Sequence, residues 1–283
     1  MRSFAFETVT LDPDGRETER RRGRARQFAE RLGQRAVLHM VQIPPGTFMM
    51  GAPADEAGSN DAERPQRRVT VPPFCLGRYP VTITQWRAVM GAVPPAMKTL
   101  NKAFMASGRQ PVVRVSHDDA EAFCRALSRK TRRDYRLPAE AEWEYACRAG
   151  TITPFAFGEA ITRDVVSHDG EVQRLAGGNP VTVPVGSLGV ANGFGLFDMH
   201  GNVWEWCRDS WHRDYQGAPI DGSAWRSDER TRVLRGGSWY SPAKLCRAAS
   251  RALGRETNSV RSREIGFRVA MAAPSVLVAP RNR

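Results

Sequence analysis

The chain has 283 residues, of which 41% are hydrophobic, so it can bury the core of one large or two ordinary domains. Its formal charge is +12, and two segments carry most of it: nine Arg against six acids in residues 1–36, and eleven Lys or Arg against four acids in residues 225–268. Such a charge permits association with nucleic acid, anionic lipid or an acidic partner but does not choose among them. Because acids are interleaved with the basic residues, we interpret both segments as solvated faces.

The cysteines exclude two common small-domain designs. They are odd in number, widely spaced and form no CxxC pair, which argues against a disulfide framework and a zinc ribbon. The N-terminus lacks the apolar segment of a signal peptide, and no apolar run is long enough to span a membrane. We therefore expect a cytoplasmic, monomeric protein with reduced thiols. The five positions are Cys75, Cys124, Cys147, Cys207 and Cys246.

The N-terminal third alternates between strand and turn signals. Residues 1–12 predict a short strand that ends at the turn sequence DPDG, residues 12–15. Residues 16–33 are rich in helix-forming residues and end at Gly33, so we predict a short basic helix or an ordered arm. Residues 37–51 predict two strands joined as a hairpin by Pro44-Pro45-Gly46, and residues 67–74 predict a further strand.

Three amphipathic helices are predicted between residues 82 and 150. Thr82 and Gln85 have the spacing of a capping box, and Ser116 and Asp119 repeat it. A third helix begins after Pro138, with Ala139 as a poor cap, and ends at Gly150. The apolar residues after the first two caps share one helical face: Trp86, Val89 and Met90 in the first helix, and Ala120, Phe123, Cys124 and Leu127 in the second.

From residue 151 onward, helical periodicity disappears and Gly, Pro, Asn and aromatic residues dominate. Long irregular segments in a compact domain usually carry function or a bound ion. Residues 232–270 are framed by a glycine pair with Trp239 at one end and by Gly266-Phe267-Arg268 at the other. We expect one α+β domain over residues 37–272, a basic N-terminal extension over residues 1–36 and a C-terminal tail over residues 273–283.

Seven sequence pieces in this order resemble the formylglycine-generating enzyme, or sulfatase-modifying factor, family. The resemblance covers roughly residues 38–272 and implies a variant of the C-type lectin fold, with low regular secondary structure and two or three helices around small antiparallel sheets. The pieces are IPPGTFMMG (43–51), YPVTITQW (79–86), PVVRVSHDDAEAFC (111–124), YRLPAEAEWEYACRAG (135–150), NGFGLFDMHGNVWEW (192–206), VLRGGSW (233–239) and IGFRVA (265–270).

The resemblance implies a copper site with two cysteines, of which this chain has only one. The oxidases of the family hold copper(I) with two cysteine thiolates, two and seven residues after the Trp of GGSW, and convert the cysteine of a sulfatase-type CxPxR peptide to formylglycine. Those positions are Ser241 and Cys246 here. Soft thiolates select Cu(I), which a hydroxyl does not replace. We therefore expect no copper and no oxidase activity, and we expect Cys246 to be a small buried apolar residue.

The resemblance also implies a structural calcium ion. In the family, the loop that corresponds to DMHGNVWE binds calcium through two side-chain oxygens and two backbone carbonyls. The positions here would be the side chains of Asp198 and Glu205 with the backbone of Gly201 and Val203. Hard oxygen donors from a glycine-containing loop suit Ca²⁺.

The same fold serves as a display scaffold in the variable proteins of diversity-generating retroelements, which diversify residues between GGSW and IGFR. This implies a non-catalytic binding protein whose surface at residues 240–264 engages a protein or other macromolecular ligand. A mixture of aromatic, small polar, aliphatic and Arg side chains suits an adaptable contact surface. The candidate positions are Tyr240, Ser241, Lys244, Leu245, Ala248, Ser250, Ala252, Leu253, Arg255, Asn258, Val260, Arg261 and Arg263.

Two alternatives remain open. The first is a copper-dependent oxidoreductase of the formylglycine-generating type, which acts on a protein cysteine with metal chemistry reassigned around Cys246. The second is nucleic-acid binding by the basic segments, which we do not favour because no recognised nucleic-acid fold or platform of stacking aromatic residues accompanies them.

Overall fold

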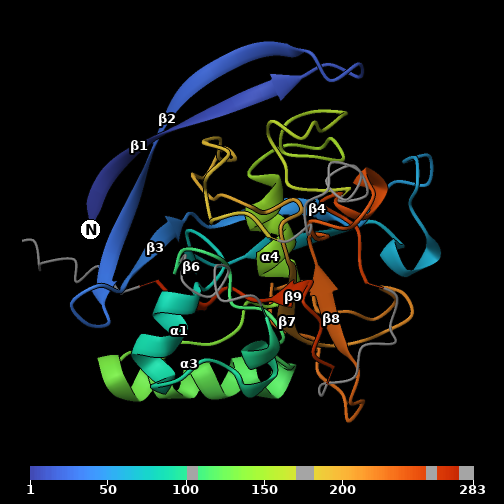
Figure 1. Cartoon of the computed structure of the whole chain (residues 1–283). Coiled ribbons are helices and arrows are strands. Elements are labelled where there is room, and N and C mark those ends of the chain that lie inside the picture. Colours follow the sequence, from blue (N-terminus) through green and yellow to red (C-terminus); the bar gives the residue numbers. More distant parts are fainter. Residues whose placement is uncertain (101–107, 170–181, 253–259, 274–283) are drawn as a thin grey trace, which may run out of the picture.

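The computed structural model describes residues 1–100, 108–169, 182–252 and 260–273. Its largest sheet has five antiparallel strands in the order β1-β2-β3-β6-β10. These strands are β1 (Arg2–Leu11), β2 (Glu17–Arg31), β3 (Val37–Ile43), β6 (Phe74–Gly77) and β10 (Ala270–Ala272). The last strand returns from the far end of the sequence to pair with β6, so the sheet ties both ends of the domain together (Figure 1).

Two smaller sheets complete the strand inventory of the described residues. One pairs β4 (Gly46–Met50) with β5 (Arg67–Val71). The other has the order β8-β7-β9, with β7 (Trp204–Ser210) antiparallel to β8 (Arg232–Arg235) and parallel to β9 (Ile265–Gly266). β8 and β9 belong to the two ends of the segment 232–270, and both pair with β7, which lies between them.

The three predicted helices are confirmed as α1 (Ile83–Met90), α3 (His117–Thr131) and α4 (Glu140–Arg148). The capping boxes at Thr82 and Ser116 are both formed. Ala139 offers no side-chain cap to α4, and its own N–H donates to Glu142 instead. Three short 3-10 helices, Asp61–Glu63, Pro95–Thr99 and Ala243–Leu245, lie in the connections.

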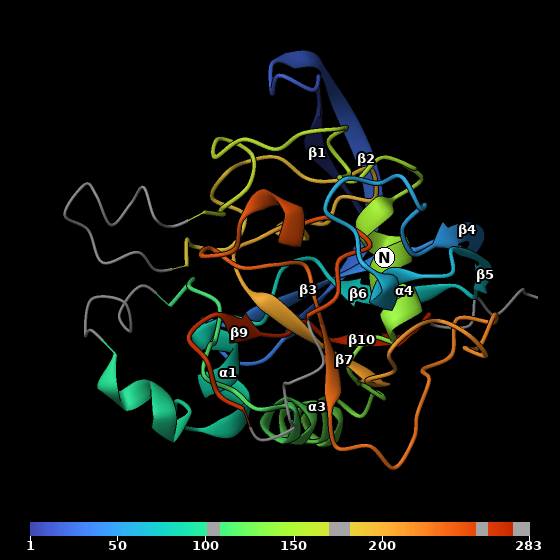
Figure 2. The same ribbon diagram turned by 90° about the vertical axis from the view of Figure 1, so that its right-hand side faces the viewer.

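The helices divide between two buried cores. α1 and α3 lie side by side (Figure 1). The Trp86 ring is stacked on Phe123 at 5.3 Å and lies edge-on to Phe267 at 6.2 Å. α4 packs against β4, β5, β7 and β8 (Figure 2). Its Trp143 is fully buried. Phe267, from the GFR sequence, is therefore an anchor of the first core, as expected.

The helix predicted for residues 16–33 is wrong, because this segment forms strand β2. The DPDG turn brings it back along β1, and the Arg20 side chain forms an ion pair across the two strands with Glu7 at 3.1 Å. Gly23 belongs to this pairing, since a Cβ there would lie 2.4 Å from the ring of Phe6. Helix propensity is a weak signal, and pairing with a neighbouring strand overrides it here. Through β1 and β2, residues 1–36 supply two strands of the largest sheet.

The predicted hairpin over residues 37–51 is also wrong. β3 pairs with β2 and β6, whereas β4 pairs with β5 in a different sheet. Pro44 and Pro45 have no N–H to donate to a ladder, so the chain changes sheets at this point instead of folding back on itself.

Candidate functional site

The loop that follows β8 approaches the core more closely than any side chain would allow. Gly236 and Gly237 have φ angles of 97° and 75°, in the region that favours glycine. A Cβ would lie 2.9 Å from the Trp143 ring at Gly236 and 2.5 Å from the Cys246 sulfur at Gly237. The glycine pair thus seats the following residues, 238–246, directly on the core.

Buried arginines fix the same segment from both sides. Arg235 donates to Glu144 at 2.5 Å, Arg247 donates to both oxygens of Glu63 at 2.8 Å, and Arg251 Nε donates to Glu140 at 2.7 Å. Arg235 and Arg251 are essentially without solvent exposure. The interpretation of residues 225–268 as a solvated face is therefore wrong for these three residues, because each arginine has an internal carboxylate partner.

The most polar part of the loop is a small hydrogen-bonded cluster, which we call the Ser238 cluster: Ser238, Ser241 and Glu264. The Ser241 Oγ accepts from the Ser238 N–H at 3.0 Å and lies 3.0 Å from the Ser238 Oγ, which donates to Glu264 at 2.9 Å. The Ser241 side chain is buried. Its hydroxyl group is therefore used in hydrogen bonds within the Ser238 cluster.

Cys246 lies under this cluster as a buried thiol, as expected. Its exposed fraction is 0%, and burial raises the pKa of the thiol to about 12, although the Ser238 N–H partly opposes the rise. A thiol of this kind stays protonated at neutral pH in the metal-free protein, and it loses its proton only where a metal ion binds it together with further ligands. With a serine at the other position, the donor set does not fit Cu(I).

The remaining cysteines provide no substitute. All five are free and buried, and burial raises the pKa of each thiol. Across residues 1–100, 108–169, 182–252 and 260–273, no group of three or more His, Cys, Asp or Glu side chains could hold a metal ion. Cys147 contacts His200, whose Nδ1 lies 2.7 Å from the Cys246 carbonyl. This histidine is therefore a hydrogen-bonded residue of the core.

The predicted calcium ligands do not fit calcium as a set. Both oxygens of Glu205 bind the Arg268 guanidinium, at 2.6 and 2.8 Å, and one of them also accepts from Trp143 Nε1 at 2.8 Å. Asp198 accepts from the Gly186 N–H at 2.8 Å, and burial raises the pKa of its carboxyl group to about 6. The positive charge that balances Glu205 is an arginine of the chain itself. Glu205 is therefore not free to bind calcium together with the Gly201 and Val203 carbonyls.

The residues predicted for a contact surface divide into three groups. Tyr240, Lys244, Arg261 and Arg263 are exposed, whereas Leu245, Ala252 and Val260 are half-buried against the first core. Ser241, Ala248 and Ser250 are buried, so a ligand at the surface does not reach them. The sequence pattern alone did not separate these groups, because small residues serve equally on a surface and in a tight core. Leu253, Arg255 and Asn258 lie outside the described residues.

A hollow that the sequence did not predict adjoins this loop. It has a volume of about 610 Å³, and Lys244 lines it together with Phe155, Glu159 and Ile152. A second hollow of about 610 Å³ is also lined by Ile152 and includes Met49. Ile152 is 87% exposed, the highest value among the large exposed hydrophobic side chains of the described residues. We call this region the Ile152 surface: Ile152 with the residues that line the two hollows.

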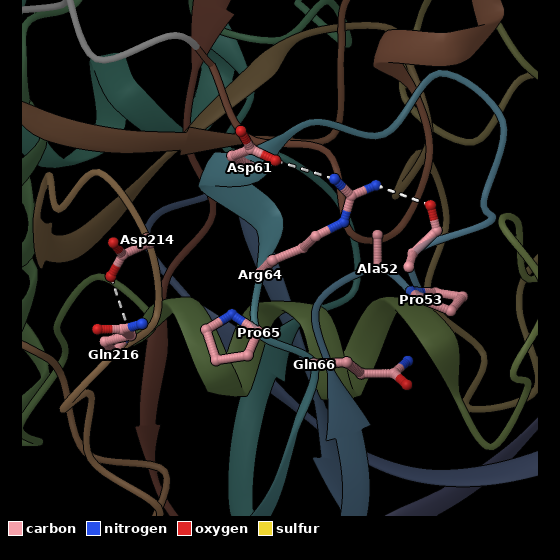
Figure 3. A pocket seen from close by; sticks show the side chains of 9 residues that line it. Ala52, Pro53, Asp61, Arg64, Pro65, Gln66, Asp214 and Gln216 are labelled. Carbon is pink, nitrogen blue, oxygen red and sulfur yellow. Dashed lines mark hydrogen bonds and ion pairs between the residues drawn. The ribbon is translucent and has the colours of Figure 1, made fainter.

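A further pocket, of about 580 Å³, lies beside the loop between β4 and β5 (Figure 3). The Arg64 guanidinium donates to Asp61 at 3.0 Å and to the Ala54 carbonyl at 3.1 Å, and Asp214 accepts from the Gln216 N–H (Figure 3). Arg64 pairs with Asp61, and Asp214 pairs with Arg213 outside the lining, so each charged group of this pocket already has a partner of opposite charge.

Comparison with known proteins establishes the family. The Sulfatase-modifying factor enzyme 1-like domain matches residues 25–273. The chain belongs to this family. It is 29% identical to the formylglycine-generating enzyme of Thermomonospora curvata, over 85% of this chain and 95% of that protein. It is 30% identical to the inactive C-alpha-formylglycine-generating enzyme 2 of Bos taurus, over 86% of this chain and 91% of that protein. Overall identity does not separate the active from the inactive relative, so the decision depends on the site residues.

Solved structures agree on the fold. PvdO from Pseudomonas aeruginosa has a TM-score of 0.74 and 34% identity, covering 87% of this chain and 98% of its own. Treponema denticola variable protein 1 has a TM-score of 0.73 and 24% identity, covering 87% and 99% of the two chains, and supports the fold alone. The described residues contain no helix long and apolar enough to cross a membrane.

Proposed function

We propose that this chain is a non-catalytic, ligand-binding member of the sulfatase-modifying factor family. The observation that carries the proposal is the Ser238 cluster, in which Ser241 replaces a copper thiolate and is hydrogen-bonded internally. Cys246, the remaining member of the expected pair, is a buried, protonated thiol. A site with this composition has no ligand pair for Cu(I) and no reactive sulfur at the surface.

The binding surface that we propose joins the exposed part of the predicted loop to the Ile152 surface. Lys244 belongs to both, because it is a candidate display position and lines the hollow beside Ile152. Tyr240 is 44% exposed and packs edge-on against Trp239, which holds its ring as a rigid contact group. An exposed aliphatic anchor, an aromatic ring and a flexible charge next to hollows are suited to a protein ligand.

Nucleic acid is a weaker candidate for this chain. Arg235, Arg247, Arg251 and Arg268 are buried and bound to carboxylates, so they are withdrawn from any phosphate-binding surface. A protein ligand, by contrast, uses the apolar contact at Ile152.

Affinity capture with matched variants tests the proposed surface. Extracts of the producing cell are passed over the wild-type protein, over Ile152→Glu and over Ile220→Glu, and the retained proteins are quantified by mass spectrometry. Ile220 is also exposed, at 67%, but lines neither hollow. We expect a ligand that the wild type and Ile220→Glu retain and that Ile152→Glu loses. Equal retention by all three proteins would remove the Ile152 surface from the proposal.

A further inference from the structure

A cavity on another part of the molecule has a strongly one-sided charge. It has a volume of about 340 Å³ and lies between β3, the connection from β6 to α1, and residues 108–109. Figure 1 shows β3, β6 and α1 gathered on the same side of the molecule. Among the described residues, three arginines and a histidine line this cavity and no Asp or Glu does: Arg35, Arg78, Arg109 and His39. None of its lining residues belongs to the loop 238–264.

Arg78 is the central cation of this cavity. Its guanidinium carbon lies 4.1 Å from the centre of the Phe4 ring and 4.8 Å from the centre of the Phe197 ring, so aromatic faces hold it in place. The side chain is half-buried, and burial lowers the pKa of Arg78, with no carboxylate among the groups that act on it. A cation that has lost water without gaining a counter-ion is costly in an unliganded protein.

Unused hydrogen-bonding groups accompany this charge. Within the described residues, Arg78 Nε and His39 Nδ1 are buried and have no hydrogen-bond partner. Arg78, Arg35 and Arg109 form no ion pair with any described residue. Arg109 Nη2 donates to the Val185 carbonyl at 3.1 Å, which holds its guanidinium at the exposed rim. The cavity therefore presents one preorganised guanidinium at its base and two more at its edge.

The start of α1 contributes side chains to the cavity but no free backbone donor at Ile83 and Thr84. The Ile83 N–H donates to the Gln110 carbonyl at 3.0 Å, and the Thr84 N–H donates to the Gly108 carbonyl at 3.1 Å. Recognition in this cavity therefore depends on the arginine side chains.

We propose that this cavity binds a small organic dianion, through Arg78 at its base and Arg109 at its rim. Guanidinium groups bind phosphate and carboxylate through paired hydrogen bonds, which makes arginine the residue of choice for both anions. The volume exceeds what an inorganic phosphate ion fills, so there is room for a short organic portion beside Tyr79 and Gln85. Phosphate monoesters and dicarboxylates share this recognition chemistry.

Titration calorimetry and thermal unfolding of the full chain test the proposal. Glycerol 2-phosphate and succinate are the probes, and sodium chloride at equal ionic strength is the control for screening. We expect saturable binding and a rise in Tm with at least one probe, and which probe binds assigns the anion as phosphate, carboxylate or either. If neither probe gives saturable binding, the proposal is wrong.

Charge-matched variants locate the binding. Arg78→Gln and Arg109→Gln each remove one positive charge from the cavity, and Arg87→Gln removes one from the exposed face of α1. Loss of a charged hydrogen-bond donor weakens binding by roughly tenfold or more. We expect this loss in both cavity variants and unchanged binding in Arg87→Gln. Arg109 is exposed, so its variant keeps the test decisive if Arg78→Gln fails to fold. Unchanged affinity in Arg109→Gln, or an equal loss in Arg87→Gln, would overturn the proposal.

Discussion

The Ser241 hydroxyl lies 3.0 Å from the Ser238 hydroxyl and accepts a hydrogen bond from the Ser238 N–H at the same distance. The same N–H acts on the Cys246 thiol, where it opposes the rise in pKa that burial causes. One backbone amide thus faces both positions at which copper oxidases of this family carry cysteines. Under the proposed function, this exchange of one sulfur for one oxygen removes the copper site while the fold is kept.

This relationship predicts that Ser241→Cys creates a site for Cu(I). The new thiol and Cys246 would share the neighbourhood of the Ser238 N–H, and two thiolates select soft Cu(I). Competition with a chromophoric Cu(I) chelator should show stoichiometric binding in Ser241→Cys and none in the wild type or in Ser241→Ala. Loss of that binding in Ser241→Cys/Cys246→Ala would confirm the pair. If Ser241→Cys binds no more copper than Ser241→Ala does, the two positions are not arranged as a ligand pair.

The buried arginines predict a sharp contrast between two ion pairs of the same C-terminal segment. Arg251→Ala removes the arginine that contacts both oxygens of buried Glu140 and leaves it the longer contact with Arg235 at 3.4 Å, and breaking a buried pair costs about 3–5 kcal/mol of unfolding free energy. Arg261→Ala breaks a pair with Asp119 that is partly exposed, which costs about 1 kcal/mol or less. Urea unfolding at neutral pH measures both values. Comparable losses for the two variants would show that Arg251 is not an internal anchor.

The Arg268–Glu205 ion pair predicts that chelators leave the stability unchanged. Because the guanidinium already balances Glu205, we expect the same Tm with EDTA and with millimolar calcium. Thermal unfolding monitored by circular dichroism, after exhaustive dialysis against chelator, provides the measurement. A saturable rise in Tm with calcium, absent with magnesium, would restore a calcium site to this loop.

His200 predicts part of the acid sensitivity of the fold. Burial lowers the pKa of its imidazole to about 4, which is below the value of about 6.5 expected in the unfolded chain. Between these values the unfolded chain binds more protons than the folded one, so stability falls as the pH falls from 6.5 to 4. The contribution is on the order of 1–3 kcal/mol. Unfolding free energies at pH 7 and pH 4.5 should differ less in His200→Gln than in the wild type. An equal difference in both proteins would assign the acid sensitivity to other groups.

The burial pattern of the loop 238–264 predicts unequal tolerance to substitution among its residues. Tyr240→Ala changes an exposed side chain, so we expect a shift in unfolding free energy of about 0.5 kcal/mol or less. Ala248→Leu forces extra methyl groups into a fully buried position and costs about 1–3 kcal/mol. A thermal-shift assay that compares the Tm of each variant with that of the wild type tests this difference. If both substitutions are tolerated, Ala248 is not a buried position.

Sequence reasoning located the helices, the framing residues Trp239 and Phe267, and the family, because capping and amphipathic spacing are local signals. It failed for β2, where pairing with β1 overrides the propensity of the residues for helix. It also failed for Arg235, Arg247 and Arg251, because their carboxylate partners lie far away in the sequence. Neither the Ile152 surface nor the cavity around Arg78 and Arg109 has a sequence motif, because several segments of the chain form each of them.

The central claim, that this chain does not oxidise cysteine, is tested most directly by a peptide assay. The protein is reconstituted with Cu(I) and incubated in air with a CxPxR peptide, with the formylglycine-generating enzyme of Thermomonospora curvata as the positive control. Mass spectrometry then detects the loss of the thiol and the gain of an aldehyde. We predict aldehyde with the control enzyme and unmodified peptide with this chain. Aldehyde formed by this chain and abolished in Cys246→Ala would contradict the account.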